Sequence, residues 1–138
     1  MISVTLDSNV WLSGLLWPGE ASKVIALAES KEILVFTSKE ILMEIFRVLQ
    51  EEEKFQLLLD EEGMYPVNVI EKIRNVSKIV KIKERLNVVK ADPDDNKILE
   101  CALSSKSTFL ITYDNHLLKI GEYGGIKIVH PTDFLRKF

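Results

Sequence analysis

The sequence predicts an α/β fold in three layers, α/β/α, with a central, mostly parallel sheet of about five strands. Short apolar runs rich in Val, Ile and Thr alternate with stretches of helical period along the chain. The chain has 138 residues, of which 46% are hydrophobic, and this suits one domain with a sizeable core. No internal repeat and no long linker is found, so we expect residues 1–138 to form a single domain.

Five short runs are expected to form the strands of the sheet. Each is rich in apolar and β-branched residues and is bounded by polar or turn-forming residues. The third run, KIVKIK, carries lysines and is expected to be more exposed than the others. The runs cover residues 2–6, 33–36, 78–83, 108–112 and 126–130.

Helices are expected between these strands, where apolar residues recur every three or four positions. Thr37 and Glu40 form a capping-box pattern ahead of the helix that follows the second strand. The stretch ADPDD is expected to be a loop because Pro93 disfavours regular structure, and Asp94 or Asp95 then begins a helix. The expected helices cover residues 9–16, 20–29, 41–49, 51–62, 67–77 and 96–105, with a closing helical turn at 131–138.

Composition excludes several classes of protein. The formal net charge is −3 and the isoelectric point is about 5.5, so the chain has no global basic footprint for nucleic acid. The single cysteine, Cys101, allows no internal disulfide and lies in an apolar run that predicts a core thiol. The first residues lack a basic leader, and no run approaches the ~20 apolar residues of a membrane span. We therefore expect a soluble, cytoplasmic protein.

Four carboxylates follow the predicted strands. Asp7 ends the first strand, Glu44 lies in the helix after the second, Asp95 begins the helix after the third, and Asp114 follows the fourth. Strand ends and helix starts share one rim of a doubly wound sheet, so these side chains are expected to converge. Converging carboxylates repel one another unless cations bridge them, and hard oxygen ligands suit Mg²⁺ or Mn²⁺. Two such ions ~3.5–4 Å apart support phosphodiester hydrolysis without a protein nucleophile.

Each acid also has a purely structural interpretation. Asp7, followed by two small polar residues, makes a good helix start. At least one of Asp92, Asp94 and Asp95 is expected to serve only as a turn or cap residue. Glu44 lies at the edge of its apolar helix face, where it can equally be solvated. The placement of four acids after successive strands nevertheless favours a shared site.

In this order the four motifs resemble the PIN domain, a metal-dependent nuclease family that includes the VapC toxins of toxin–antitoxin pairs. The family opens with a strand ending in Asp, then Ser or Thr, then Asn, as DSN does here at residues 7–9. Its second acid lies in a helix like SKEILMEI, its third opens a helix like DNKILECA, and its fourth follows a strand like LITYD. These stretches hold Glu44, Asp95 and Asp114, and the wording DPDDNKILECAL is most similar to the toxin subgroup of the family.

The resemblance implies cleavage of RNA, which is expected to be single-stranded, to 5′-phosphate and 3′-hydroxyl ends with Mg²⁺ or Mn²⁺ as cofactor. The residues implied to ligate metal are Asp7, Asp95, Asp114 and Glu44, the last either directly or by orienting the attacking water. Those implied to support the carboxylates are Ser8, Asn9 and Thr112. An antitoxin partner and a homodimer are also implied, and apolar residues at 57–59 and 69–76 could form the dimer contact.

Two residues depart from the family pattern. Many members carry another acid two residues after the fourth, where this chain has His116. The centre is therefore expected to hold a second metal weakly or to use one metal, and His116 and Asp94 stand as further candidate site residues. Asn96 follows the third acid where several members have Ala, and it is expected only to alter local polarity.

Two further features have alternative interpretations. Residues 71–90 carry seven basic and two acidic side chains. This basic stretch is either a flank that contacts phosphates or a solvated helix and edge strand. Trp11 and Trp17 flank the helix after Asp7 and are expected to stack on bases or to pack in the core or a dimer contact.

The leading function is an active endoribonuclease, and the second is a PIN-fold module that binds RNA or protein without cutting, which His116 keeps open. A response-regulator phosphoacceptor is disfavoured because the first strand is followed by a single Asp.

Overall fold

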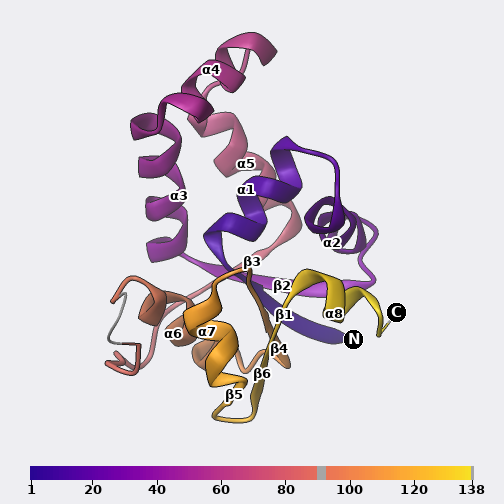
Figure 1. The fold of residues 1–138 in the computed structure, drawn as a ribbon, viewed down its shortest axis with the longest axis vertical. Coiled ribbons are helices and arrows are strands. Elements are labelled where there is room, and N and C mark those ends of the chain that lie inside the picture. The colour runs from indigo at the N-terminus through magenta and orange to yellow at the C-terminus, as the bar shows by residue number, and fades with distance from the viewer. Residues whose placement is uncertain (90–92, 138) are drawn as a thin grey trace.

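The computed structural model describes residues 1–89 and 93–137 of the chain. Within them, six strands form one sheet in the order β3-β2-β1-β4-β6-β5 (Figure 1). All neighbouring strands are parallel except β5 and β6, so the predicted, mostly parallel sheet is confirmed. The strands are β1 (Ile2–Leu6), β2 (Ile33–Ser38), β3 (Lys78–Val80), β4 (Phe109–Ile111), β5 (Glu122–Tyr123) and β6 (Ile126–Val129).

Helices cover both faces of this sheet. α1, α2, α3 and α5 lie on one side and α6 and α7 on the other (Figure 1), which gives the three predicted layers. α6 packs against β1, β2 and β4, while α2 and α3 pack against β2. The helices of the described part are α1 (Ser8–Leu16), α2 (Glu20–Glu29), α3 (Lys39–Glu51), α4 (Glu53–Glu62), α5 (Pro66–Val76), α6 (Asp95–Ser105), α7 (Asn115–Ile120) and α8 (Pro131–Leu135).

β1 lies at the centre of the sheet, where the path of the chain reverses. Val4 pairs in register with Val35 of β2 on one side and with Phe109 of β4 on the other. The helices that lead from β1 to β2 lie on one face, and α6, which leads into β4, lies on the opposite face. Open α/β sheets bind ligands at such a switch point, outside the carboxyl ends of the strands.

Aromatic side chains close the core. Trp11 and Phe134 are fully buried, and Phe134 meets the ring of Phe109 edge to face with centroids 5.5 Å apart. Trp11 therefore packs in the core and has no surface on which a base could stack. Trp17 is 41% exposed and its ring lies 5.8 Å from that of Phe55, so it packs at the rim.

Cys101 is fully buried, as predicted for a core thiol. Burial raises the pKa of this thiol to about 12, so it stays protonated and unreactive at neutral pH. No helix in the described part of the chain is long and apolar enough to span a bilayer.

The cap of α3 lies one residue later than the sequence predicted. Ser38 is the N-cap, and its Oγ accepts a hydrogen bond from the backbone N–H of Ile41 at 3.2 Å. Thr37 is fully buried because β2 continues two residues beyond its predicted end at residue 36. Glu40 binds Arg85 at 2.9 Å, so it pairs with a distant segment as well as lying in the first turn.

The segment after β4 contains two elements that the sequence did not predict. α7 has six residues and β5 has two, and runs this short show no usable periodicity. β3 is shorter than predicted, ending at residue 80, and lies at the edge of the sheet. Its exposed lysine fits the interpretation of a solvated edge strand. Of the predicted loop at 91–95, residues 91 and 92 lie outside the described residues.

Candidate metal centre

The acids that the sequence singled out come from four elements at the carboxyl edge of the sheet. Asp7 directly follows β1, and its backbone N–H binds the carbonyl of Ile111 at the end of β4 at 3.0 Å. Asp114 follows β4 and caps α7, Asp95 is the first residue of α6, and Glu44 lies in α3. β1 and β4 are parallel neighbours, so the loops that carry Asp7 and Asp114 emerge side by side.

Asp7 is buried and tightly held. Its Oδ1 accepts a hydrogen bond from the backbone N–H of Ser8 at 2.7 Å, and its Oδ2 accepts one from the hydroxyl of Thr112 at 2.6 Å. Burial raises the pKa of this carboxyl to about 6, with further contributions from the charges of Glu44 and Asp114, although both hydrogen bonds oppose the rise. A cation bound beside Asp7 would lower the electrostatic cost of keeping this buried carboxyl ionised.

Ser8 and Thr112 connect the acids to one another. The hydroxyl of Ser8 donates to Oε2 of Glu44 at 2.5 Å, which joins α1 to α3. The hydroxyl of Thr112 donates to Asp7 and accepts from the backbone N–H of Asp114 at 2.9 Å. These two small polar residues thus fix the positions of three of the four acids.

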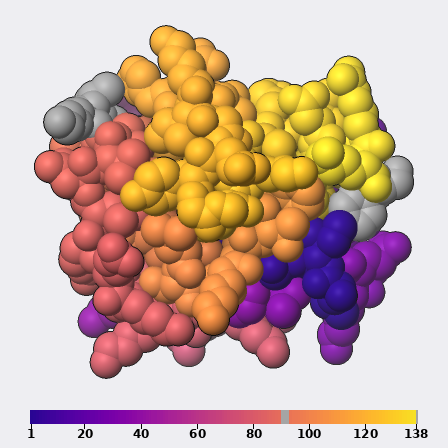
Figure 2. All heavy atoms as spheres, turned by 90° about the horizontal axis from the view of Figure 1, so that it is seen from below, coloured from indigo at the N-terminus to yellow at the C-terminus, as the bar shows by residue number. Residues whose placement is uncertain are grey.

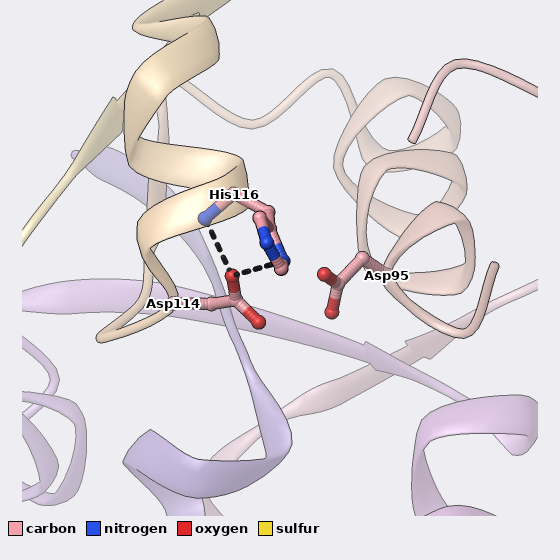
Figure 3. Close-up of side chains that lie close together, drawn as sticks. All are labelled: Asp95, Asp114 and His116. Atoms are coloured by element: carbon pink, nitrogen blue, oxygen red, sulfur yellow. Dashed lines mark hydrogen bonds and ion pairs between the residues drawn. The ribbon is translucent and has the colours of Figure 1, made fainter. Parts of the chain in front are cut away.

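Asp95, Asp114 and His116 form a compact group whose side chains point toward one another (Figure 3). One ligand atom from each residue lies within 4.8 Å of the others. Nδ1 of His116 lies 3.6 Å from Oδ1 of Asp114, and that same oxygen accepts the backbone N–H of His116 at 2.7 Å. The group combines two carboxylates with one imidazole, and this donor set can hold a divalent cation.

Two other predicted candidates lie away from this group. Asn9 is exposed, and within the described residues its side chain makes no hydrogen bond to the carboxylates. Asp94 has a side chain that is 51% exposed and binds Nζ of Lys97 at 3.1 Å. Asp92 lies outside the described residues. The first residue of α6, Asp95, is therefore the acid of this set that faces Asp114.

Asn96 does more than alter local polarity, so that expectation was wrong. It is buried, and its Oδ1 accepts the backbone N–H groups of Val88 and Val89, each at 2.9 Å. Its Nδ2 donates to the carbonyls of Val89 and Pro93 at 3.0 and 3.1 Å. Asn96 therefore ties together the backbone on both sides of residues 90–92, directly before Asp95.

Glu100, one turn after Asn96, holds the same segment. It is buried, and its carboxylate accepts the backbone N–H of Leu86 at 2.7 Å and a guanidinium N–H of Arg85 at 3.2 Å. Seen from the side of α6 and α7, the chain that follows β3 lies along the flank of the C-terminal half (Figure 2). Sequence reasoning missed Glu100; its position four residues after Asn96, on the same face of α6, is the signal that could have indicated this arrangement.

A hollow of about 570 Å³ adjoins the acids on the α3 side. Glu44 lies at its edge, and two cationic side chains, Arg47 and Lys97, line it. Arg47 pairs with Glu51 at 3.0 Å on the surface, and such exposed pairs are weak enough for another anion to displace them. The hollow therefore places carboxylates and cations side by side. Its lining is Glu40, Met43, Glu44, Arg47, Asp94 and Lys97.

Comparison with known proteins places this geometry in context. A family model described as a PIN domain matches residues 3–116. The fold is similar to VapBC2 from Rickettsia felis bound to a promoter DNA fragment, with a TM-score of 0.62 and 12% identity over 94% of this chain and 98% of that one. It is also similar to DNA-bound VapBC from Salmonella typhimurium, with a TM-score of 0.57 and 16% identity over 95% of this chain and 99% of that one. No curated protein matches the sequence.

Proposed function

The chain belongs to the PIN domain family, and from that premise we propose that it is an Mg²⁺- or Mn²⁺-dependent endoribonuclease acting on single-stranded RNA. The observation that carries this proposal is the group of Asp95, Asp114 and His116 at the switch point of the sheet, with Asp7 close enough to Asp114 for their charges to interact. Residues 1–138 are proposed to act as one domain, because the sheet takes strands from residue 2 to residue 129.

The residues of the centre have separable roles in this proposal. Asp95 and Asp114 would hold the divalent cation, with Asp7 beside them. A bound cation supplies charge neutralisation at the phosphate and lowers the pKa of a coordinated water. Glu44, which accepts a hydrogen bond from Ser8, would orient the attacking water and accept its proton. Thr112 keeps Asp7 and Asp114 in register through its two hydrogen bonds.

The hollow beside Glu44 offers a path for the substrate strand. Its cations can contact phosphates that flank the scissile bond, while the carboxylates face the bond itself. The lining carries two cations, Arg47 and Lys97, against three carboxylates. Binding of a polyanion would therefore depend on these individual side chains and on a bound metal ion, not on a local excess of positive charge.

Replacing Arg47 with Ala is expected to raise the KM for RNA about three- to tenfold with little change in kcat, because one phosphate contact is removed. Steady-state cleavage at low and moderate salt measures both constants. Arg136→Ala is the matched control, since Arg136 is an exposed arginine paired with Asp133 on α8. An unchanged KM for Arg47→Ala, or an equal rise in the control, would exclude this path for the strand.

The proposal is tested by incubating a labelled single-stranded RNA with the protein in Mn²⁺, in Mg²⁺ or in EDTA. Cleavage to products with 5′-phosphate ends is expected with metal and is expected to stop in EDTA. Absence of cleavage with every metal on several RNAs would support the second function, a PIN-fold module that binds RNA or protein without cutting.

We further propose that the chain is the toxin of a toxin–antitoxin pair. Two of the structures that share its fold are VapBC assemblies bound to DNA. An exposed apolar groove of about 300 Å³ between α3 and α5, which includes Met43 and Phe46, offers a surface that an antitoxin could cover. Leu57, which is 57% exposed, is available for a homodimer contact.

A further inference from the structure

The imidazole of His116 is the feature of the centre that carboxylate chemistry leaves unexplained. The other histidine of the chain, His130, caps α8 by accepting the backbone N–H of Thr132 through Nδ1. His116 instead turns its ring toward the two acids (Figure 3). Its backbone N–H binds Asp114, and Nδ1 of its ring lies 3.6 Å from the same carboxylate.

The spacing of these three side chains suits one shared ion. A divalent ion with bonds of about 2.1 Å places neighbouring ligands about 3 Å apart and opposite ligands about 4 Å apart. The ligand atoms of Asp95, Asp114 and His116 all lie within 4.8 Å of one another, and Nδ1 of His116 lies 3.6 Å from Asp114. These separations are somewhat longer than those between bonded ligands, so a bound ion would draw the three side chains closer together.

We propose that His116 is a metal ligand and that it makes this centre select a first-row transition ion, such as Mn²⁺, over Mg²⁺. The inference deepens the proposed function, on which it rests, by naming the ion. Mg²⁺ is a hard ion that keeps oxygen ligands and water, whereas divalent first-row transition ions accept imidazole nitrogen, Mn²⁺ the most weakly of the series. A centre of three carboxylates without the imidazole discriminates far less between the two.

The test uses Mn²⁺ itself as the probe and does not depend on cleavage. Binding of Mn²⁺ to the full chain is followed by electron paramagnetic resonance, and pulsed measurements detect coupling between the ion and a ¹⁴N nucleus. Competition with Mg²⁺ gives the selectivity. The variants are His116→Asp, which keeps a ligand but supplies oxygen, and His130→Asn as the matched control on α8.

The wild type and His130→Asn are expected to show ¹⁴N coupling and to need a large excess of Mg²⁺ for displacement of Mn²⁺. His116→Asp is expected to bind Mn²⁺ without ¹⁴N coupling and with a selectivity at least about tenfold lower. Bound Mn²⁺ without ¹⁴N coupling in the wild type overturns the inference and leaves the nuclease proposal standing. Coupling that is present in the wild type and disappears in His116→Asp supports His116 as a metal ligand. If the wild type with bound Mn²⁺ also leaves RNA intact, the nuclease proposal is overturned and the ligand assignment stands.

Discussion

Asp95→Asn is expected to lower metal-dependent RNA cleavage at least about a hundredfold. The substitution keeps the size of the side chain and removes the negative charge that faces Asp114 and His116. In the proposed function the ion would be held through charge, so losing one of two carboxylates in this group is expected to weaken binding of the cation and to remove its contribution to the transition state. Single-turnover cleavage of a labelled RNA in Mn²⁺ measures the effect.

Two acid-to-amide variants accompany this one. Asp94→Asn alters the neighbouring acid, whose exposed side chain pairs with Lys97, and Asp133→Asn alters an exposed acid on α8. Both are expected to retain cleavage within about threefold of the wild type. If Asp95→Asn cuts normally while Asp94→Asn does not, the ligand is Asp94. Circular dichroism of each variant separates loss of activity from loss of fold.

Asp7→Asn is expected to stabilise the metal-free protein at neutral pH. The pKa of Asp7 is raised from 3.8 to about 6 by burial, so the folded chain holds this proton more tightly than the unfolded chain. As the pH rises through this window, the unfolded state releases the proton first and the free energy of unfolding falls. Above the pKa that Asp7 has in the folded state, its ionised carboxylate lowers the free energy of unfolding by about 2–3 kcal/mol. The variant has no ionisable group at this position and avoids this loss.

Urea unfolding in EDTA at pH 4 and at pH 7.5 measures this difference. The stability of Asp7→Asn relative to the wild type is expected to increase by about 2 kcal/mol between the two values of pH. If the amide side chain of the variant loses the hydrogen bond from Thr112, that loss applies at both pH values and cancels in the comparison. Asp133→Asn is the matched acid-to-amide control at an exposed carboxyl. If the stability of Asp7→Asn relative to the wild type is the same at both pH values, burial does not raise the pKa of Asp7.

Most of the sheet could be predicted from the sequence because burial on both faces leaves a plain signal. β1, β2, β4 and β6 are short β-branched runs bounded by polar residues, and each lies within about two residues of its expected bounds. The acids at the strand ends could be assigned to one edge of the sheet because the carboxyl ends of parallel strands lie at the same edge. Their roles as metal ligands belong to the proposed function.

What the sequence did not predict depends on contacts between distant segments. Whether Thr37 or Ser38 caps α3 depends on how far β2 continues, and its pairing with β3 extends it to Ser38. The role of Asn96 depends on backbone groups of an extended segment that shows no helical or strand pattern. Local propensity carries no information on such partners, so these errors fall at the ends of elements and in the segment before Asp95.

The hydrogen bond between Thr112 and Asp7 spans 105 residues, and this separation bears on how the protein is made. A ribosome adds about 5–20 residues each second, so roughly 5–20 s pass between synthesis of Asp7 and synthesis of Asp114. Until β4 emerges and pairs with β1, the central strand lacks one neighbour and its acid has no hydroxyl partner. The central strand and the buried acid at its end therefore reach their native partners only late in synthesis.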